Sequence, residues 1–224
     1  IHERLVGSEM CIRDRDIMKR VLSFILALTM TLTLCACGSG SGKLSPYLMD
    51  FQFGAGEDAT EKTILDLEKN DTFTVNGIEF SSVSADYSDG YMSGIQYTAD
   101  DVITLGGCAT SSDNPNIDVD ISLAETTVSD LVEKYNQAYA ILVKSFGKPD
   151  KGNTAEQLLT QEDFEMYYTS NDVSALWYYD GHTIILKAEG TIGTYSQPIT
   201  DYALVSYFRY LIPTLTLSIT DHLE

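Results

Sequence analysis

The chain has 224 residues and far more acid than base, with 33 Asp and Glu residues against 14 Lys and Arg residues and a formal net charge of −19. So acidic a protein is a poor partner for nucleic acid, which needs a basic footprint, and for anionic lipid headgroups. We interpret the charge as favouring solubility rather than as an acidic binding patch. The length suits one domain or two small ones, with a sizeable core.

The first 17 residues differ in character from the segment that follows. Residues 5–15 read Leu-Val-Gly-Ser-Glu-Met-Cys-Ile-Arg-Asp-Arg and resemble the conceptual translation of a sequencing adapter. A signal peptide begins at its own Met, and Met18 is followed at once by Lys19 and Arg20. We therefore expect residues 1–17 to be a translation artefact and Met18 to be the true start, and we predict no structure for them.

An apolar run fills residues 21–34. It is shorter than the roughly 20 residues that a membrane-spanning helix needs. It has the length of the hydrophobic region of a secretory signal, and the two basic residues before it fit the positive start of such a signal. The sequence therefore predicts a signal peptide over residues 18–36.

The run ends in Leu34-Cys35-Ala36-Cys37. This tetrapeptide resembles the lipobox of bacterial lipoproteins, from which it departs only in having Cys at the second place. The resemblance implies that signal peptidase II cuts before Cys37 and that the Cys37 thiol carries diacylglycerol, which would hold the protein on the outer face of the cell membrane. Residues 37–44 would then be the lipidated Cys and a flexible Gly/Ser linker. The alternative is a cleaved signal without lipid.

Removal of residues 1–36 would take away five of the basic and four of the acidic residues, which leaves a net charge of −20. The lipid would therefore be the sole membrane attachment that we expect. A single extracytoplasmic domain is expected over residues 45–224.

The first half of this domain predicts a short helix and several strands. Apolar residues at helical spacing indicate a helix over 58–69. Asn76-Gly77 is a strong hairpin signal between two short strands. The strands expected in this half are 72–75, 78–84, 91–97, 102–105 and 117–123.

The clearest element is a helix over residues 126–146, whose apolar residues recur at three- and four-residue spacing. A capping box is expected at residues 127–130. Gly147 fits a helix C-cap, and Pro149 prevents continuation. The residues expected on the buried face are Val128, Leu131, Val132, Tyr135, Ala138, Tyr139, Leu142, Val143 and Phe146.

The second half predicts strands again, over 164–169, 173–179, 183–188, 202–211 and 214–220, with a hairpin turn at Asp180-Gly181. The fold class is α+β: an antiparallel sheet of hairpins with one long and one shorter helix on one face. The order suggests a tandem duplication of helix plus strands, with a subdivision near residue 124. Gly54 and the Phe146-Gly147-Lys148-Pro149 ending resemble small envelope lipoproteins of the outer-membrane-assembly and β-lactamase-inhibitor-like type, which implies the same arrangement.

No catalytic motif is recognisable in the sequence, and we expect no catalytic residue, no cofactor and no metal. His182 and His222 are the histidines of the expected domain, too few with one Cys for a structural zinc site. Cys108 is the lone Cys of the folded part, so no internal disulfide is expected and a buried thiol is the default. The acidic loops 86–90 and 113–120 leave calcium open as the alternative to ordinary turns.

Adjacent aromatic pairs recur in the predicted strands, at 167–168, 178–179 and 207–208. Neighbours in a strand point to opposite faces of a sheet, so one member of each pair should lie on the face away from the helices. We expect Tyr167, Tyr178 and Tyr207 there, beside Lys187 and Arg209. Tyrosines beside charge suit protein or carbohydrate, although strand propensity alone could also explain them.

Together these patterns predict a membrane-anchored extracytoplasmic lipoprotein with a non-enzymatic binding domain for protein or carbohydrate. One alternative is a structural component of an envelope complex, which a large apolar surface patch would favour. Another is a surface hydrolase, which a deep pocket around His182 or a carboxylate pair would favour.

Overall fold

The structure is a computed structural model that describes residues 42–112, 116–199 and 204–221. The signal segment, the lipobox with Cys37, and His222 lie outside the described residues. The described residues from Lys43 onward form one compact unit, with no division among them near residue 124. This unit begins earlier than expected, because Leu44, which the sequence places in the linker, is buried with 1% of its surface exposed.

The described residues form one large antiparallel sheet and one small hairpin. In the large sheet the strand order is β3-β4-β9-β8-β7-β6, and β5 pairs with the part of β9 that lies beyond β4. The predicted α+β class is confirmed. The strands of the large sheet are β3 (Ser82–Ser88), β4 (Tyr91–Asp100), β5 (Ile103–Thr110), β6 (Lys151–Gly152), β7 (Thr169–Tyr179), β8 (His182–Ile199) and β9 (Leu204–Asp221).

Strand β9 lies at the centre of the sheet and pairs with β8 along its whole length. On its other edge, residues 214–220 pair with β4 and residues 205–211 pair with β5. Pro213 falls between these two partners, so its missing N–H removes no pair from that edge. The prediction of two strands, 202–211 and 214–220, is therefore wrong, because one strand continues through Pro213.

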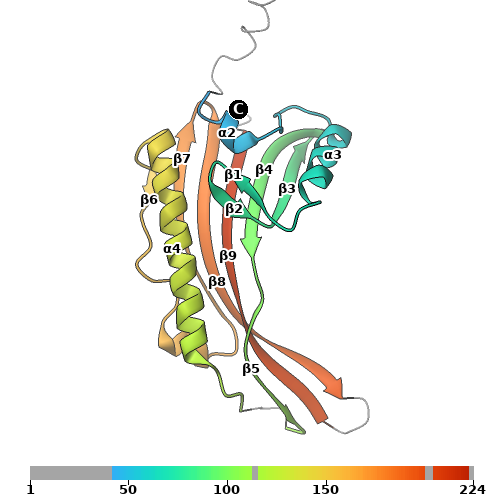
Figure 1. Cartoon of the computed structure of the whole chain (residues 1–224), viewed down its shortest axis with the longest axis vertical. Helices are drawn as coiled ribbons and strands as arrows, with labels where there is room; N and C mark the ends of the chain where they lie inside the picture. Colours follow the sequence, from blue (N-terminus) through green and yellow to red (C-terminus); the bar gives the residue numbers. More distant parts are fainter. Residues whose placement is uncertain (1–41, 113–115, 200–203, 222–224) are drawn as a thin grey trace, which may run out of the picture. The chain divides into compact units, whose positions relative to one another are not determined.

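Strand β8 is also longer than predicted and runs to Ile199 instead of ending at Ala188. Gly190, Gly193 and Pro198 in its second half are residue types that disfavour the interior of a strand. Gly193 serves close packing instead, because a Cβ there would lie 2.3 Å from the Tyr210 hydroxyl oxygen on the neighbouring strand. We call residues 103–110, 193–199 and 204–211 the distal ribbon, since they lie beyond the last β7–β8 pair, Thr169 with Ile192. Figure 1 shows this ribbon beyond the end of the long helix.

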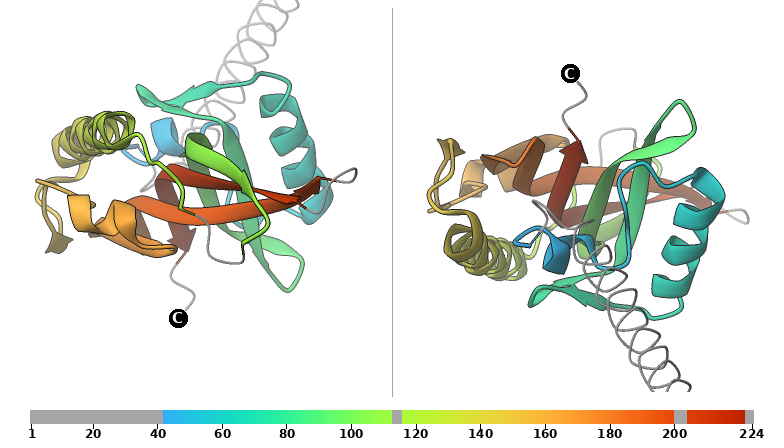
Figure 2. Two further views of the ribbon diagram at one scale, coloured as in Figure 1. Left: turned by 90° about the horizontal axis from the view of Figure 1, so that it is seen from below. Right: turned by 90° about the horizontal axis from the view of Figure 1, so that it is seen from above.

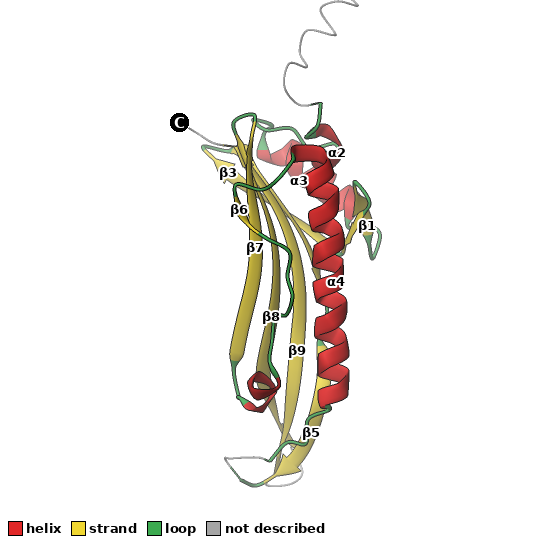
Figure 3. Ribbon diagram, turned by 90° about the vertical axis from the view of Figure 1, so that its left-hand side faces the viewer, coloured by secondary structure: helices red, strands yellow, loops and turns green. Residues whose placement is uncertain are grey.

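Helix α4 (Ile121–Phe146) packs on one face of the sheet, against β7, β8 and β9 (Figures 1 and 3). It begins five residues earlier than predicted, because the Asp120 carboxylate accepts a hydrogen bond from the Leu123 N–H at 2.9 Å and caps the helix there. Residues 117–123 are therefore not a strand, and Thr127 lies inside the helix instead of in a capping box. At the other end Gly147 has φ +87° and ends the helix as predicted.

The first elements of the chain pack around Tyr97 of β4. These are α2 (Ser45–Leu48) and the β1–β2 hairpin (Phe73–Val75 and Ile78–Phe80). Helix α3 (Glu57–Leu67) packs against β3 and β4 (Figure 2). The Tyr97 hydroxyl donates to the Tyr47 carbonyl oxygen at 2.8 Å, and its ring contacts Phe51, Phe73 and Phe80. The predicted strand 78–84 is split, because β2 belongs to the small hairpin and β3 to the large sheet. Helix α2 was not predicted.

The segment from α4 to β7 is tied to the helix by polar contacts. The Asn136 side-chain amide makes two hydrogen bonds of 2.9 Å with the backbone of Ala155, one through each end of the amide. The Trp177 indole N–H donates to the Gly147 carbonyl oxygen at 2.9 Å. The predicted strand 164–169 is wrong: residues Gln161–Glu165 form a 3₁₀ helix that buries Phe164, and β7 begins only at Thr169.

Candidate functional site

Tyr178 lies where the sequence predicted it, on the open face of the sheet, which is the face turned away from α4. Its neighbour Trp177 is buried and contacts the Tyr139 ring of α4 at 5.8 Å between centroids. Alternation therefore turns Tyr178, which is 51% exposed, to the opposite face. Lys187 shares that face because it follows the buried Leu186 on β8.

Tyr207 and Arg209 do not lie on the open face, and this part of the prediction is wrong. Strand β9 keeps one alternation through Pro213, so both residues share the helix side with the buried Leu211. Tyr167 precedes β7 and is not in a strand; its ring lies on the Arg209 guanidinium, 5.1 Å from centroid to carbon. Tyr178 lies level with Thr220 of β9, because both residues pair with Thr183 of β8. Tyr207 is thirteen residues from Thr220 along β9, which is a distance of about 40 Å. The three tyrosines thus form no common surface.

The open face around Tyr178 is polar and its charges are compensated. Lys187 Nζ lies 2.8 Å from Glu189 Oε2 and 3.6 Å from Asp172 Oδ2, and the Ser170 hydroxyl donates to Glu189 at 2.6 Å. The hydrogen bond to Glu189 raises the pKa of Lys187, and the hydrogen bonds from Lys187 and then Ser170 lower the pKa of Glu189. Because all three charged side chains are about one-third or more exposed to solvent, the pairs stabilise the fold little. Phe208 and its partner Tyr195 also belong to this face by alternation, but twelve residues of β9, or about 40 Å, separate Phe208 from the level of Tyr178, so they form no aromatic platform with it.

A cleft of about 580 Å³ lies on the helix side, between α4 and the β1–β2 hairpin, over the junction of β4 with β9. This volume falls within the range of small-molecule and peptide pockets. Its inner surface is apolar and mostly aliphatic. The apolar lining residues are Ile78, Phe80, Ala99, Ile103, Leu131, Ala138, Ile141, Pro213 and Leu215.

Charged side chains surround the mouth of the cleft. Four carboxylates and one ammonium group line it, and all five residues are exposed: Glu79 from β2, Asp100 and Asp101 at the end of β4, and Asp130 and Lys134 from α4. The excess of three negative charges favours a ligand that carries positive charge. No sequence pattern predicted this site, because its lining residues come from four separate segments of the chain.

Buried tyrosines hold the two walls of the cleft in place. Tyr97 fixes the hairpin wall from beneath, as described above. Tyr135 fixes the α4 wall, since its hydroxyl donates to the Asn153 carbonyl oxygen at 2.9 Å. Burial raises the pKa of Tyr97, and burial together with the neighbouring Tyr139 raises the pKa of Tyr135 to about 12. Both phenols therefore stay protonated, and keep these hydrogen bonds, over the whole neutral range.

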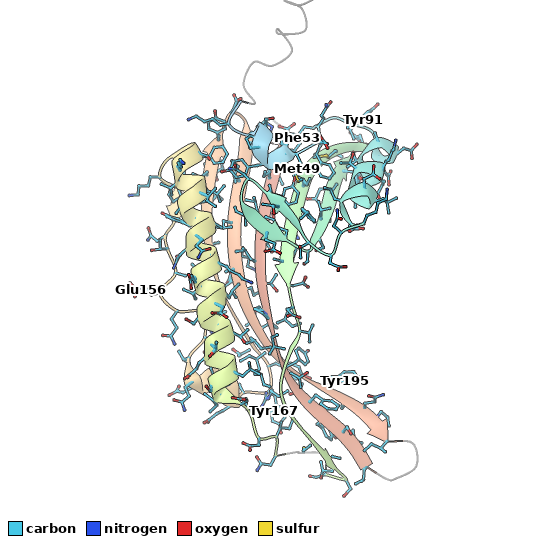
Figure 4. All side chains as sticks on the ribbon, in the orientation of Figure 1. Met49, Phe53, Tyr91, Glu156, Tyr167 and Tyr195 are labelled. Carbon is cyan, nitrogen blue, oxygen red and sulfur yellow. The ribbon has the colours of Figure 1, made fainter. Side chains whose placement is uncertain are left out.

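Exposed apolar side chains gather where the distal ribbon joins the rest of the sheet (Figure 4). Five of the ten large apolar residues that are exposed in the described part of the chain lie there: Met166, Tyr167, Tyr168, Tyr195 and Phe208. Tyr195 and Phe208 are direct cross-strand partners on the open face. Tyr167, in contrast, lies on the helix side over Arg209, so the five residues surround the sheet at this level. We call these five residues the distal apolar surface.

The residues that could carry catalysis are scattered. The His182 ring packs against the Phe53 ring with centroids 4.7 Å apart and a tilt of 38°. Its Nδ1 lies 2.8 Å from the Asp180 carbonyl oxygen, and its Nε2 lies 3.8 Å from Asp221 Oδ1. His182 lines neither the cleft nor the distal apolar surface. Cys108 is half-buried on β5, with a free thiol. The Asp89-Gly90 loop is the turn between β3 and β4, and the described residues hold no cluster of three or more metal-ligating side chains.

Comparisons with known proteins give no relative to guide the choice among these surfaces. No family model matches the chain. A search of curated proteins and a search of solved structures also find no match. Within the described residues, no helix is both long and apolar enough to cross a membrane.

Proposed function

We propose that the protein is a lipid-anchored, extracytoplasmic binding domain whose cleft takes up a segment of a partner protein. The observation that carries this proposal is the combination, in one cleft, of an aliphatic floor with a mouth that bears four carboxylates and one lysine. A peptide with an aliphatic side chain next to Lys or Arg would satisfy both parts of the cleft, by burying apolar area and by pairing with the acidic mouth.

A protein partner fits the cleft better than a carbohydrate does. Sugars are held largely by stacking on exposed aromatic rings, and the one aromatic residue that lines the cleft, Phe80, has 0% of its surface exposed. The exposed carboxylates also support binding rather than hydrolysis. A carboxyl group that transfers protons generally works in a desolvated site, whereas these four side chains face solvent.

The anchor in this proposal is the Cys37 lipid, as the lipobox resemblance implies. The acidic surface leaves little attraction to anionic headgroups. Lys43 and Leu44 begin the folded unit, where Lys43 lies over the Tyr179 ring at 5.6 Å. Cys37 precedes Lys43 by six residues, and a chain of this length would hold the domain close to the bilayer.

Charge reversal on opposite walls of the cleft tests the proposal. Glu79 and Asp130 stand on the hairpin and helix walls, and the double variant E79K/D130K changes the net charge by four. The matched control E68K/E156K changes it equally at two exposed positions outside the cleft. Binding would be measured by fluorescence anisotropy with eight-residue peptides that place Lys, Gln or Glu beside an aliphatic residue, and with a panel of neutral oligosaccharides.

We expect the Lys-containing peptides to bind best and to lose about 2 kcal/mol of binding free energy in E79K/D130K at low salt, or about 30-fold in Kd. The control should bind like the wild type. Equal weakening in both variants would reduce the effect to net charge, and binding of the oligosaccharides alone would overturn the proposed partner class.

The distal apolar surface supports a second candidate, a structural component of an envelope complex. Its Tyr195–Phe208 pair places two exposed aromatic rings side by side on the open face, and exposed aromatic residues are enriched in protein interfaces. The variant Y195S/F208S distinguishes the two candidates. It should leave peptide binding at the cleft unchanged, and it should release the protein from a large complex on native gels only if the second candidate is right.

A further inference from the structure

Arg209 is the one arginine between residue 21 and residue 224, in a chain that has 33 acidic residues. It lies on β9, on the helix side of the sheet, and only 5% of its surface is exposed. Burying a guanidinium group is costly unless an opposite charge or a full set of hydrogen bonds compensates it. The partners of Arg209 therefore need a complete account.

Its described partners are neutral and do not use all of its donors. One terminal nitrogen, Nη1, donates to the Met166 carbonyl oxygen, and the other, Nη2, lies 3.5 Å from the Glu165 carbonyl oxygen. The Tyr167 ring covers one face of the guanidinium. The Nε–H is buried and has no hydrogen-bond partner.

No carboxylate lies within ion-pair distance of Arg209 in the described part of the chain. Lys69 is exposed and Lys187 is partly buried, and each has at least one carboxylate within 4 Å. The buried cation thus has no described counter-ion, although the chain is rich in acids.

Arg209 lines a pocket of about 280 Å³. The pocket is smaller than typical drug-sized sites. Its apolar walls are Ile117, Val119, Ile121 and Phe164, and Tyr167 and Asn116 add an aromatic ring and an amide. Ile121 is the first residue of α4, so the pocket also lies at the helix end that favours negative charge. The side chains of Asp118 and Glu165, which also line the pocket, are exposed and set an acidic border.

We propose that this pocket binds the carboxylate of a small organic acid with an apolar body, with Arg209 as the anion receptor. A planar carboxylate matches the fork of a guanidinium edge, and the apolar walls suit a short aliphatic group. The acidic border disfavours a phosphate dianion more than a carboxylate, because the dianion carries twice the negative charge. The pocket is separate from the cleft, so this proposal does not depend on the cleft binding a peptide.

The test uses the chain as purified from membranes, in detergent, labelled with ¹⁵N-arginine. The Nε–H signal of Arg209 is assigned by its loss in Arg209→Lys. N-acetyl-L-leucine is the probe, and N-acetyl-L-leucinamide, which lacks the charge, is the matched control. We expect the acid to shift the Arg209 signal saturably and to bind at least tenfold more tightly than the amide.

Four results would overturn the proposal. The first is no saturable shift with the acid, and the second is an equal shift with the amide. The third is binding that appears only in Asp113→Asn, which would show that an acid of the chain itself occupies the receptor; Asp113 lies outside the described residues. Inorganic phosphate is a further arm, and phosphate binding as tight as that of the acid would overturn the assignment to a carboxylate. The comparison of acid with amide needs only the wild-type chain, so it stands even if Arg209→Lys folds poorly.

Discussion

Tyr97→Phe should lower the stability of the domain at neutral pH and raise it, relative to the wild type, at high pH. At pH 7 the variant loses the 2.8 Å hydrogen bond from the Tyr97 hydroxyl to the Tyr47 carbonyl oxygen and leaves that acceptor buried. Such a loss costs about 1–2 kcal/mol. The ring contacts with Phe51, Phe73 and Phe80 should survive, because only one oxygen atom is removed.

The sign reverses because burial raises the pKa of Tyr97 in the folded state. In the unfolded chain a tyrosine titrates near pH 10, so above this pH the unfolded state loses a proton that the folded state keeps. The free energy of unfolding of the wild type then falls by up to about 1.4 kcal/mol per pH unit through this one group. Tyr97→Phe lacks the group, so a cost of about 1–2 kcal/mol at pH 7 predicts that the two stability curves cross between about pH 10.6 and pH 11.5.

Urea unfolding followed by circular dichroism, at half-unit steps from pH 7 to pH 11.5, measures both effects. Tyr195→Phe is the matched control for the loss of one hydroxyl, because its side chain is 55% exposed; at pH 7 it should stay within about 0.5 kcal/mol of the wild type. Curves for Tyr97→Phe and the wild type that remain parallel to pH 11.5 would refute the reasoning, since they would show that the Tyr97 phenol is not held neutral by burial.

Three further predictions concern the anchor and the contacts that hold α4. Cys37→Ala should move the protein from the membrane fraction to the soluble fraction, while Cys35→Ala stays with the membrane; membrane retention of Cys37→Ala on immunoblots would contradict the lipid anchor. Asn136→Ala should lower the free energy of unfolding by about 1–3 kcal/mol, because it leaves the Ala155 N–H and carbonyl without their side-chain partner, and an unchanged urea midpoint would count against that contact. Trp177→Phe should cost a similar amount by losing the indole donor and some of its packing, which chemical denaturation followed by circular dichroism would show.

Sequence patterns correctly predicted those helix ends and turns that depend only on neighbouring residues. The helix ending at Gly147 and the hairpin at Asn76-Gly77 were predicted, because helical periodicity and the positive φ of a tight turn depend on neighbouring residues. The start of α4 was missed. Residues 121–125 add one turn to the helix, and a stretch of alternating apolar residues before it favoured a strand.

The errors in the second half come from pairing between distant strands. Pro213 looked like a break, but it sits where β9 has no partner on one edge. Because the predicted strand ended before Pro213, the side-chain alternation of residues 214–220 was not extended back to Arg209. That alternation places Arg209 on the helix side. Phe164 had the pattern of a strand and instead fills the core from a 3₁₀ helix. No local rule contains this information.

The candidate sites depend even more on tertiary structure. Glu79 and Asp130 are 51 positions apart in the sequence and meet at one cleft because the β1–β2 hairpin stands opposite α4. From the sequence, Arg209 was predicted only as a charged residue beside Tyr207 on the open face of the sheet. Its burial, and its lack of a described acidic partner, follow from the packing of residues 164–167 against β9.

Site-specific photo-crosslinking in the native membrane tests the central claim most directly. A photoreactive residue replaces Gln137, which lines the cleft, or in the control Glu156, which lies outside it. The proposed function predicts a discrete crosslinked partner protein from position 137, lost when E79K/D130K is combined with it, and none from position 156. Equal crosslinking from both positions, or a product from position 137 that survives the charge reversal, would contradict the assignment of the cleft as the binding site.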